Sequence, residues 1–179
     1  EKVIWSDTYR VTLDELFSVR QDIVSAVVTA ADIRIPQNEA ALLGNAPTEM
    51  LDAWGLYHLG VRHLYRFNGP DNTKAAAYFT LALEQDPHFG RATAGLSYTE
   101  FENFNLGFGA QKAAHQANAL LQAERSVDLD PHDPFCNLVL GRARWIHEDI
   151  EGAQAWTDRA VNLNPNYAFG HYNRGKFAA

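Results

Sequence analysis

Apolar residues recur at helical spacing in successive stretches of residues 48–179, and each stretch ends at an acidic or amide residue followed by proline. The three terminating pairs are Asp86-Pro87, Asp130-Pro131 and Asn164-Pro165. Proline cannot donate the next hydrogen bond of a helix, and it disfavours helical backbone in the residue before it. The pattern therefore predicts three helices that end in the same way.

The distances between the prolines indicate an internal repeat. Pro165 follows Pro131 by 34 residues, and Pro131 follows Pro87 by 44 residues. A period of 34 is typical of a repeat made of two helices. The ten extra residues of the longer unit are predicted to lengthen a turn at residues 103–109, where Gly107 and Gly109 favour a loop.

Small residues stand at fixed distances before the prolines, with one large residue between them in the first unit. Ala75, Phe79 and Ala82 in the first unit correspond to Ala153, Thr157 and Ala160 in the third. The middle unit has Ala119, Ala123 and Ser126 in the same register. Small side chains let paired helices approach closely, so this register predicts helix-to-helix contacts.

Helix starts can be predicted from capping residues. Asp133 precedes Pro134, which is the order expected of an N-cap followed by the first helical residue. Asp71 and Asp149 are predicted to cap the second helices of their units. Near the beginning of the chain, Thr12 and Glu15 form a capping box that predicts a helix running to about residue 31.

With this register and period, residues 48–179 resemble three tetratricopeptide repeats followed by the first helix of a fourth. The resemblance implies an all-α fold, a right-handed superhelix of stacked antiparallel helix pairs. Residues 1–35, with Trp5 to Tyr9 and Gln21 to Val24, are similar to the end of the TolB-like region of bacterial multidomain regulators. Residues 36–47 are then a linker.

Those regulators join tetratricopeptide repeats to an output domain that is either a winged-helix DNA-binding domain or a class III adenylate or guanylate cyclase. The resemblance therefore implies that this chain is a non-catalytic regulatory and protein-binding segment of a larger bacterial signalling protein. A transcriptional regulator is the first expectation, and a cyclase is the alternative. The chain starts at Glu1 with a strand-like run, which predicts that it was cut from a longer protein.

In this family the first helix of each repeat lines a concave groove, which implies a set of candidate partner-binding residues. They are Trp54, Tyr57, Arg91, Tyr98, Phe101, Phe135, Arg142, Trp145 and Tyr172. Tyrosine, tryptophan and arginine dominate binding hot spots because they combine a large contact area with a polar group. A protein or peptide partner is expected in this groove. The alternative is that these aromatic residues pack against the neighbouring repeat.

The incomplete fourth repeat carries a prediction of its own. Phe169, Tyr172 and Phe177 lack the second helix that would cover them, so they are expected to be exposed. Exposed apolar surface of this kind favours self-association through the end of the array.

Composition excludes several classes of partner. A hydrophobic fraction of 46% is too high for a disordered chain. The chain has 22 acidic and 15 basic residues and no cluster of basic residues, so nucleic-acid binding is not expected. No apolar stretch reaches the roughly 18 residues needed to cross a membrane, which predicts a cytoplasmic protein. The single Cys136 is predicted to be a buried, inert thiol.

The sequence predicts no catalytic residue, no cofactor and no metal site. The seven histidines lack the spacing of a metal-binding pair, and no glycine-rich phosphate loop or nucleophile elbow is present. Glu100 and Glu102 are interpreted as solvated or partner-facing charges rather than as an acid and base pair. The alternative function is a small-molecule sensor, with a pocket at Tyr98, Phe104 and Phe108.

Overall fold

The computed structural model describes residues 51–177 together with Thr8, Ile23 and Val27. Its described part contains helices and no strand; the helices are α3 (Ala53–Leu64), α4 (Gly69–Gln85), α5 (Gly90–Asn105), α6 (Lys112–Leu129), α7 (Pro134–Ile146), α8 (Ile150–Leu163) and α9 (Ala168–Phe177). The predicted extended segment, first helix and linker fall within residues 1–47, outside the described residues apart from those three positions. No described helix has the length and apolar character needed to cross a membrane.

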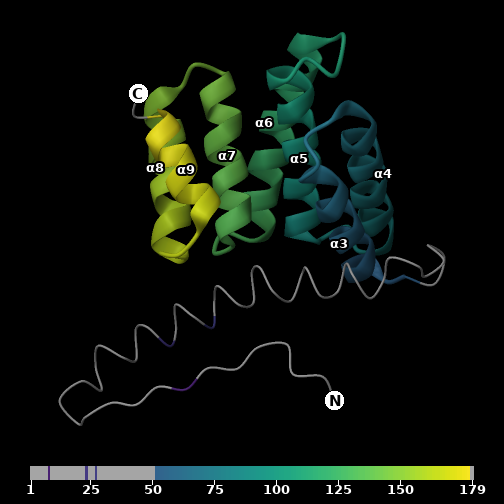
Figure 1. The fold of residues 1–179 in the computed structure, drawn as a ribbon, viewed down its shortest axis with the longest axis horizontal. Helices are drawn as coiled ribbons and strands as arrows, with labels where there is room; N and C mark the ends of the chain where they lie inside the picture. Colours follow the sequence, from purple (N-terminus) through teal and green to yellow (C-terminus); the bar gives the residue numbers. More distant parts are fainter. Residues whose placement is uncertain (1–7, 9–22, 24–26, 28–50, 178–179) are drawn as a thin grey trace.

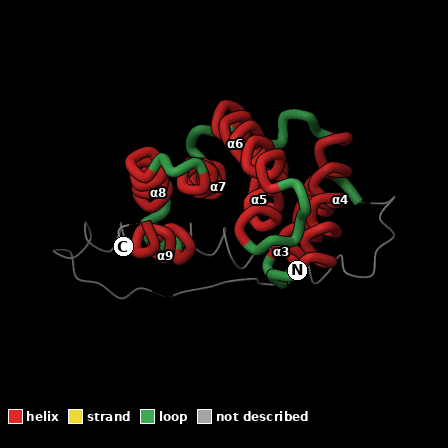
Figure 2. Tube along the Cα trace, turned by 90° about the horizontal axis from the view of Figure 1, so that it is seen from above, coloured by secondary structure: helices red, strands yellow, loops and turns green. Residues whose placement is uncertain are grey.

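The helices form successive hairpins, as the repeat pattern predicts. Helices α3 and α4, α5 and α6, and α7 and α8 pack in pairs, and α9 packs on α8 and α7 (Figure 1). Helices α5 and α7 also contact each other, while α3 packs on α5 and α9 packs on α7. Seen from above, α5 and α7 form the back of a concave surface, with α3 and α9 at its two sides (Figure 2). The predicted all-α helical repeat fold is confirmed.

Each second helix ends where its proline predicts. Helices α4, α6 and α8 stop at Gln85, Leu129 and Leu163, and the next residue is the C-cap in every case. The backbone N–H of each C-cap donates to the carbonyl four residues earlier, at 2.9–3.1 Å. The proline that follows removes the next donor, so the helix cannot continue.

Two of the predicted N-caps are confirmed and one is wrong. The Asp133 carboxylate accepts hydrogen bonds from the backbone N–H groups of Phe135 and Cys136, at 2.8 and 3.0 Å. Asp149 accepts from Gly152 at 2.9 Å. In α4 the N-cap is Asn68 rather than Asp71, because the helix already begins at Gly69 and Asp71 lies within its first turn.

The prediction that the ten extra residues of the second repeat lengthen only a turn at residues 103–109 is wrong, because some of them extend the two helices. Helices α5 and α6 have 16 and 18 residues, against 13 and 14 in α7 and α8. The turn covers residues 106–111, compared with 147–149 in the next repeat. Residues 103–105 stay helical because the i to i+4 hydrogen bonds continue to Leu106. Gly107 is in the loop, at a φ of 72° that favours glycine.

Phe79 is the centre of the contact between the first two repeats. Its side chain is fully buried and lies between Gly60 of α3 and Gly95 of α5. A Cβ atom at Gly60 would lie 2.5 Å from the Phe79 ring, and one at Gly95 would lie 2.7 Å from it. Ala75 and Ala82 are also fully buried. The predicted role of this register in close helix packing is therefore confirmed.

Asp133 connects the second and third repeats, and its removal gives a testable loss of stability. Besides capping α7, it forms an ion pair with Arg91 of α5 at 2.5 Å. Asp133→Ala is expected to lower the free energy of unfolding by about 1–2 kcal/mol, as measured by urea denaturation. Asp133→Asn retains the cap without the charge and should cost less. Asp149→Ala removes a cap together with an exposed ion pair to Arg144 at 3.7 Å. A cost for Asp133→Ala no larger than that of Asp149→Ala would contradict a role for the more buried Arg91–Asp133 pair.

Candidate functional site

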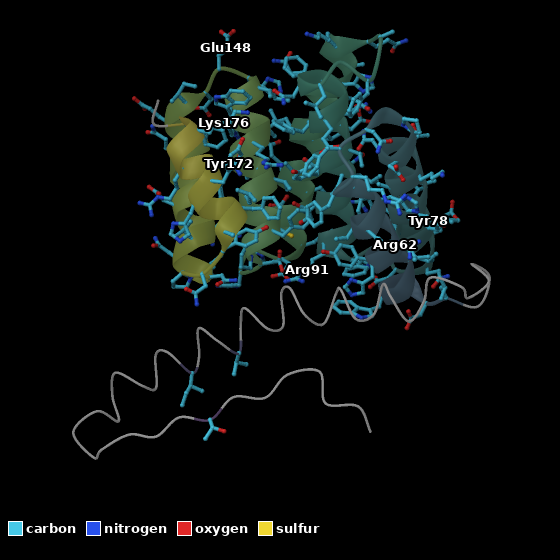
Figure 3. All side chains as sticks on the ribbon, in the orientation of Figure 1. Arg62, Tyr78, Arg91, Glu148, Tyr172 and Lys176 are labelled. Atoms are coloured by element: carbon cyan, nitrogen blue, oxygen red, sulfur yellow. The ribbon has the colours of Figure 1, made fainter. Side chains whose placement is uncertain are left out.

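A pocket with a volume of about 460 Å³ lies on the concave face between α5, α7 and α9. Aromatic rings make up much of its wall, and one arginine, one lysine, one glutamate and two asparagines add polar groups. The lining residues are Phe67, Tyr98, Phe101, Glu102, Asn105, Leu106, Arg142, Ala168, Phe169, Tyr172, Asn173 and Lys176. Tyr172 and Lys176 both come from α9 (Figure 3). The pocket is therefore built from the first helices of three successive repeats, and Phe67 from the turn after α3 adds to its wall.

Arg142 crosses the floor of the pocket and is only 5% exposed. Its guanidinium lies over the ring of Tyr98, 4.2 Å from the centroid, and 5.2 Å from that of Phe101. The Nε–H group donates to Oδ1 of Asn173 at 3.1 Å, which joins α7 to α9. The Nη1 atom is buried and has no hydrogen-bond partner among the described residues. Part of the hydrogen-bonding capacity of this cation is therefore unused.

Glu102 lies beside Arg142 in the pocket and is 2% exposed. Neither carboxylate oxygen has a hydrogen-bond partner in the part of the chain that the structure describes. Burial raises the pKa of Glu102 from 4.5 to about 7, and the charge of Arg142 opposes this shift only in part. Of the two predicted environments for Glu102, the solvated one is wrong because the side chain is buried in the pocket, and the partner-facing one stays a prediction. An unpaired buried polar group costs about 1–3 kcal/mol.

Aromatic contacts connect the two sides of the concave surface. Tyr65, the C-cap of α3, stacks on Phe169 of α9 with ring centroids 5.1 Å apart and an interplanar angle of 13°. Phe67 follows in the same turn, with a φ of 51°, and lines the pocket. The turn after α3 thus contacts α9 and closes one side of the pocket.

The exposure predicted for the last repeat is correct for one of its aromatic residues. Tyr172 is 65% exposed, whereas Phe177 is 5% exposed and Phe169 is half-buried. Phe177 stacks on Trp145 of α7 at 5.6 Å, so the preceding repeat covers the ring that a missing helix was expected to leave open. Self-association through this end of the array stays a prediction, and its support is confined to Tyr172.

Comparison with solved structures decides the fold class. The first tetratricopeptide domain of Spaghetti (RPAP3), described as bound to the HSP90 peptide SRMEEVD, superimposes with a TM-score of 0.53 at 17% identity. The match covers 71% of this chain and 90% of that domain. The NMR structure of the first such domain of human RPAP3 gives a TM-score of 0.50 at 17% identity, over 68% and 91% of the two chains. The fold is of the tetratricopeptide type.

Sequence comparison gives one further similarity. No protein-family model matches the chain. A curated protein of Rhizobium meliloti (strain 1021), named "Putative adenylate cyclase 3", is 22% identical over 153 residues, which is 85% of this chain. The chain spans 26% of the length of that relative.

The fold brings four of the nine predicted groove residues to the pocket, namely Tyr98, Phe101, Arg142 and Tyr172. The others lie elsewhere. Tyr57 and Phe135 are 5% and 7% exposed and pack within the core. Trp54 stacks on Phe89, Arg91 pairs with Asp133, and Trp145 contacts both Phe177 and Lys176. Whether these residues bind a partner stays a prediction.

Several pocket residues are not among the predicted ones. Glu102 and Asn173 each follow a predicted groove residue by one position, so a groove prediction extended by one residue would have included them. Phe67 belongs to a turn, and no helical register could have placed it. Phe104 and Phe108, predicted to gather near Tyr98, do not line the pocket. Phe104 lies under Lys112 instead, with Nζ 5.5 Å from the ring centroid.

Two other titratable groups of the array are buried away from the pocket. Cys136 is fully buried, and burial raises the pKa of its thiol, as predicted for an inert cysteine. His58 is also fully buried, and burial lowers its pKa from 6.5 to about 4. Its ring lies 4.4 Å from that of Trp54, and neither ring nitrogen has a partner within residues 51–177. Within the described residues, no three potential ligands are grouped to hold a metal ion.

Proposed function

We propose that this array is a non-catalytic module that binds a peptide segment of a protein partner on its concave face. The observation that carries the proposal is the pocket of about 460 Å³, in which aromatic rings surround a buried arginine with unused hydrogen-bonding capacity. Such convergence of aromatic and arginine side chains is typical of binding hot spots. A solved domain of similar fold is described as bound to a peptide, which supports this mode of binding.

Tyr172 provides a test that does not disturb the fold. It lines the pocket and is 65% exposed, so Tyr172→Ala should leave the helix content and the melting temperature nearly unchanged. A peptide selected from a random display library should bind this variant at least about tenfold more weakly, because tyrosine supplies contact area at low entropic cost. Isothermal titration calorimetry measures the difference.

The control for this experiment is Leu121→Ala on α6. Leu121 is 61% exposed and does not line the pocket, so its removal should not change peptide affinity. Equal affinity of the Tyr172→Ala variant and the native protein would contradict the pocket as the peptide site.

The array is proposed to regulate a larger bacterial signalling protein. The distant relative is named as an adenylate cyclase, which favours the cyclase over the transcriptional regulator as the setting. The full-length protein is then expected to convert ATP to cyclic AMP at a rate that changes when the selected peptide is added. A protein that instead binds DNA and forms no cyclic AMP would favour the transcriptional regulator.

A small-molecule sensor is the second candidate function, because the pocket volume lies within the range of about 300–1,000 Å³ usual for small ligands. A ligand bound to the native state raises the melting temperature. Thermal-shift screening of metabolites separates the candidates: a compound that raises the melting temperature and competes with the peptide would identify a sensor. The absence of such a compound, together with peptide binding, would support the protein-binding module.

A further inference from the structure

The floor of the pocket holds an unpartnered acceptor next to an unpartnered donor. The two oxygens of Glu102 on α5 and the Nη1 atom of Arg142 on α7 are buried without hydrogen-bond partners among the described residues. The two side chains are 2% and 5% exposed, and both line the same pocket. Buried polar groups are nearly always paired, so two adjacent exceptions in one pocket indicate a ligand.

The charges of this pair restrict the ligand chemistry. Glu102 and Arg142 balance each other when both are ionised, so a ligand group with a net charge would leave one of them uncompensated. Lys176 is the other charged residue of the lining; it is exposed, and its Nζ atom lies over Trp145, 4.1 Å from the centroid. The Asn173 amide is already used, because it accepts from Arg142 and donates to the Phe169 carbonyl at 2.7 Å. The complement of the pair is a neutral group with one donor and one acceptor.

We propose that the pocket binds the side-chain carboxamide of a glutamine or asparagine in the partner segment. Its N–H group donates to the Glu102 carboxylate, and its carbonyl accepts from Nη1 of Arg142. The rings of Tyr98, Phe101 and Tyr172 contact the methylene groups of the same side chain. Because both polar groups are shielded by their neighbours, a rotamer change of Glu102 accompanies binding. This inference rests on the proposed peptide-binding function and adds the residue type that the pocket selects.

A negatively charged or a positively charged side chain of the peptide fits the Glu102–Arg142 pair poorly. A glutamate in the bound peptide would place a second carboxylate against Glu102, and a lysine would approach Arg142 without offering it an acceptor. A site that hydrogen-bonds a polar group discriminates strongly against analogues that cannot complete the same bonds, because its own buried groups are then left unpaired. Selectivity for an uncharged amide over its charged counterparts is therefore the property to measure.

The experiment is selection of a random peptide library on the purified chain at pH 8, where Glu102 is ionised. One position of the selected peptides should be enriched in glutamine or asparagine. A synthetic peptide with glutamine at that position should bind at least about tenfold more tightly than the same peptide with glutamate or lysine, as measured by calorimetry. Leu121→Ala, outside the pocket, should leave this preference unchanged.

Glu102→Gln is the decisive variant, because it keeps the shape of the side chain and removes only its charge. Arg142 is then uncompensated, so the ratio of glutamate-peptide to glutamine-peptide affinity should rise at least about tenfold compared with the native protein. An unchanged ratio would overturn the carboxamide assignment. Selected peptides with acidic, basic or only apolar residues at the conserved position would overturn it as well, while leaving the peptide-binding function intact.

A failure to select any peptide would contradict the proposed function itself. The pocket chemistry is then decided with N-acetyl-glutamine methylamide as the probe, titrated at millimolar concentration. Its binding should shift the NMR signal of the Arg142 Nε–H group, and N-acetyl-glutamate methylamide should do so less. No shift with either probe, or a larger shift with the glutamate probe, would overturn the inference.

Discussion

Phe79→Ala is expected to lower the free energy of unfolding by about 3–5 kcal/mol, the largest loss of any single substitution considered for this protein. The ring is fully buried between Gly60 and Gly95, so its removal leaves a cavity between three helices. Each repeat is stabilised by its own helix pair and by its neighbours, so the loss of this ring weakens the interface between the first and second repeats. Urea denaturation followed by circular dichroism measures the effect.

The two glycines allow a sharper version of this test. Gly95→Ala would place a Cβ atom 2.7 Å from the Phe79 ring and is expected to destabilise the protein by about 1–3 kcal/mol. In the double variant with Phe79→Leu, the alanine should cost less, because the smaller side chain leaves room for it. Leu121→Ala, at an exposed position, should change stability by less than about 0.5 kcal/mol. Strictly additive losses would contradict the packing described for Phe79.

Glu102→Gln is expected to raise the free energy of unfolding at pH 8 by about 2–3 kcal/mol. The folded-state pKa of Glu102 is about 7, above its ordinary value of 4.5. Its stabilising contribution is therefore complete below about pH 4.5 and is lost as the pH rises through about 7. At pH 8 the native protein holds a buried carboxylate whose desolvation outweighs its attraction to Arg142, and glutamine removes that charge. Unchanged stability at pH 8 would contradict this pKa.

The pH dependence of the same variant gives an independent check through His58. The pKa of this histidine is lowered to about 4, so its contribution to stability is present above about pH 6.5 and is lost as the pH falls through about 4. Between about pH 4.5 and 6.5 the two groups act in opposite directions in the native protein. In Glu102→Gln the histidine acts alone, and stability should fall on acidification across this interval. Denaturation midpoints measured at pH 5, 6, 7 and 8 test the difference in slope.

The candidate site could be predicted from the sequence in part. The repeat register predicts Tyr98, Arg142 and Tyr172 as groove residues, because the inner face of each first helix recurs at fixed positions, and all three line the pocket. For Glu102 the sequence leaves a solvated and a partner-facing charge open, since a glutamate on an amphipathic helix is usually on a polar side. Its burial depends on how closely α7 and α9 approach α5, which is a property of three repeats together.

The sequence by itself determined the described helical repeats, their order and the residue at which the second helix of each repeat ends. Proline after each second helix removes a backbone donor, and glycine or alanine at the contact positions permits close pairing; both effects are local. Only the tertiary structure decided which side chains of the concave face are buried and which contact one another. It brought the turn at Tyr65 against Phe169, covered Phe177 with Trp145, and enclosed Glu102 beside Arg142. These contacts depend on the curvature accumulated over successive repeats, which no single repeat encodes.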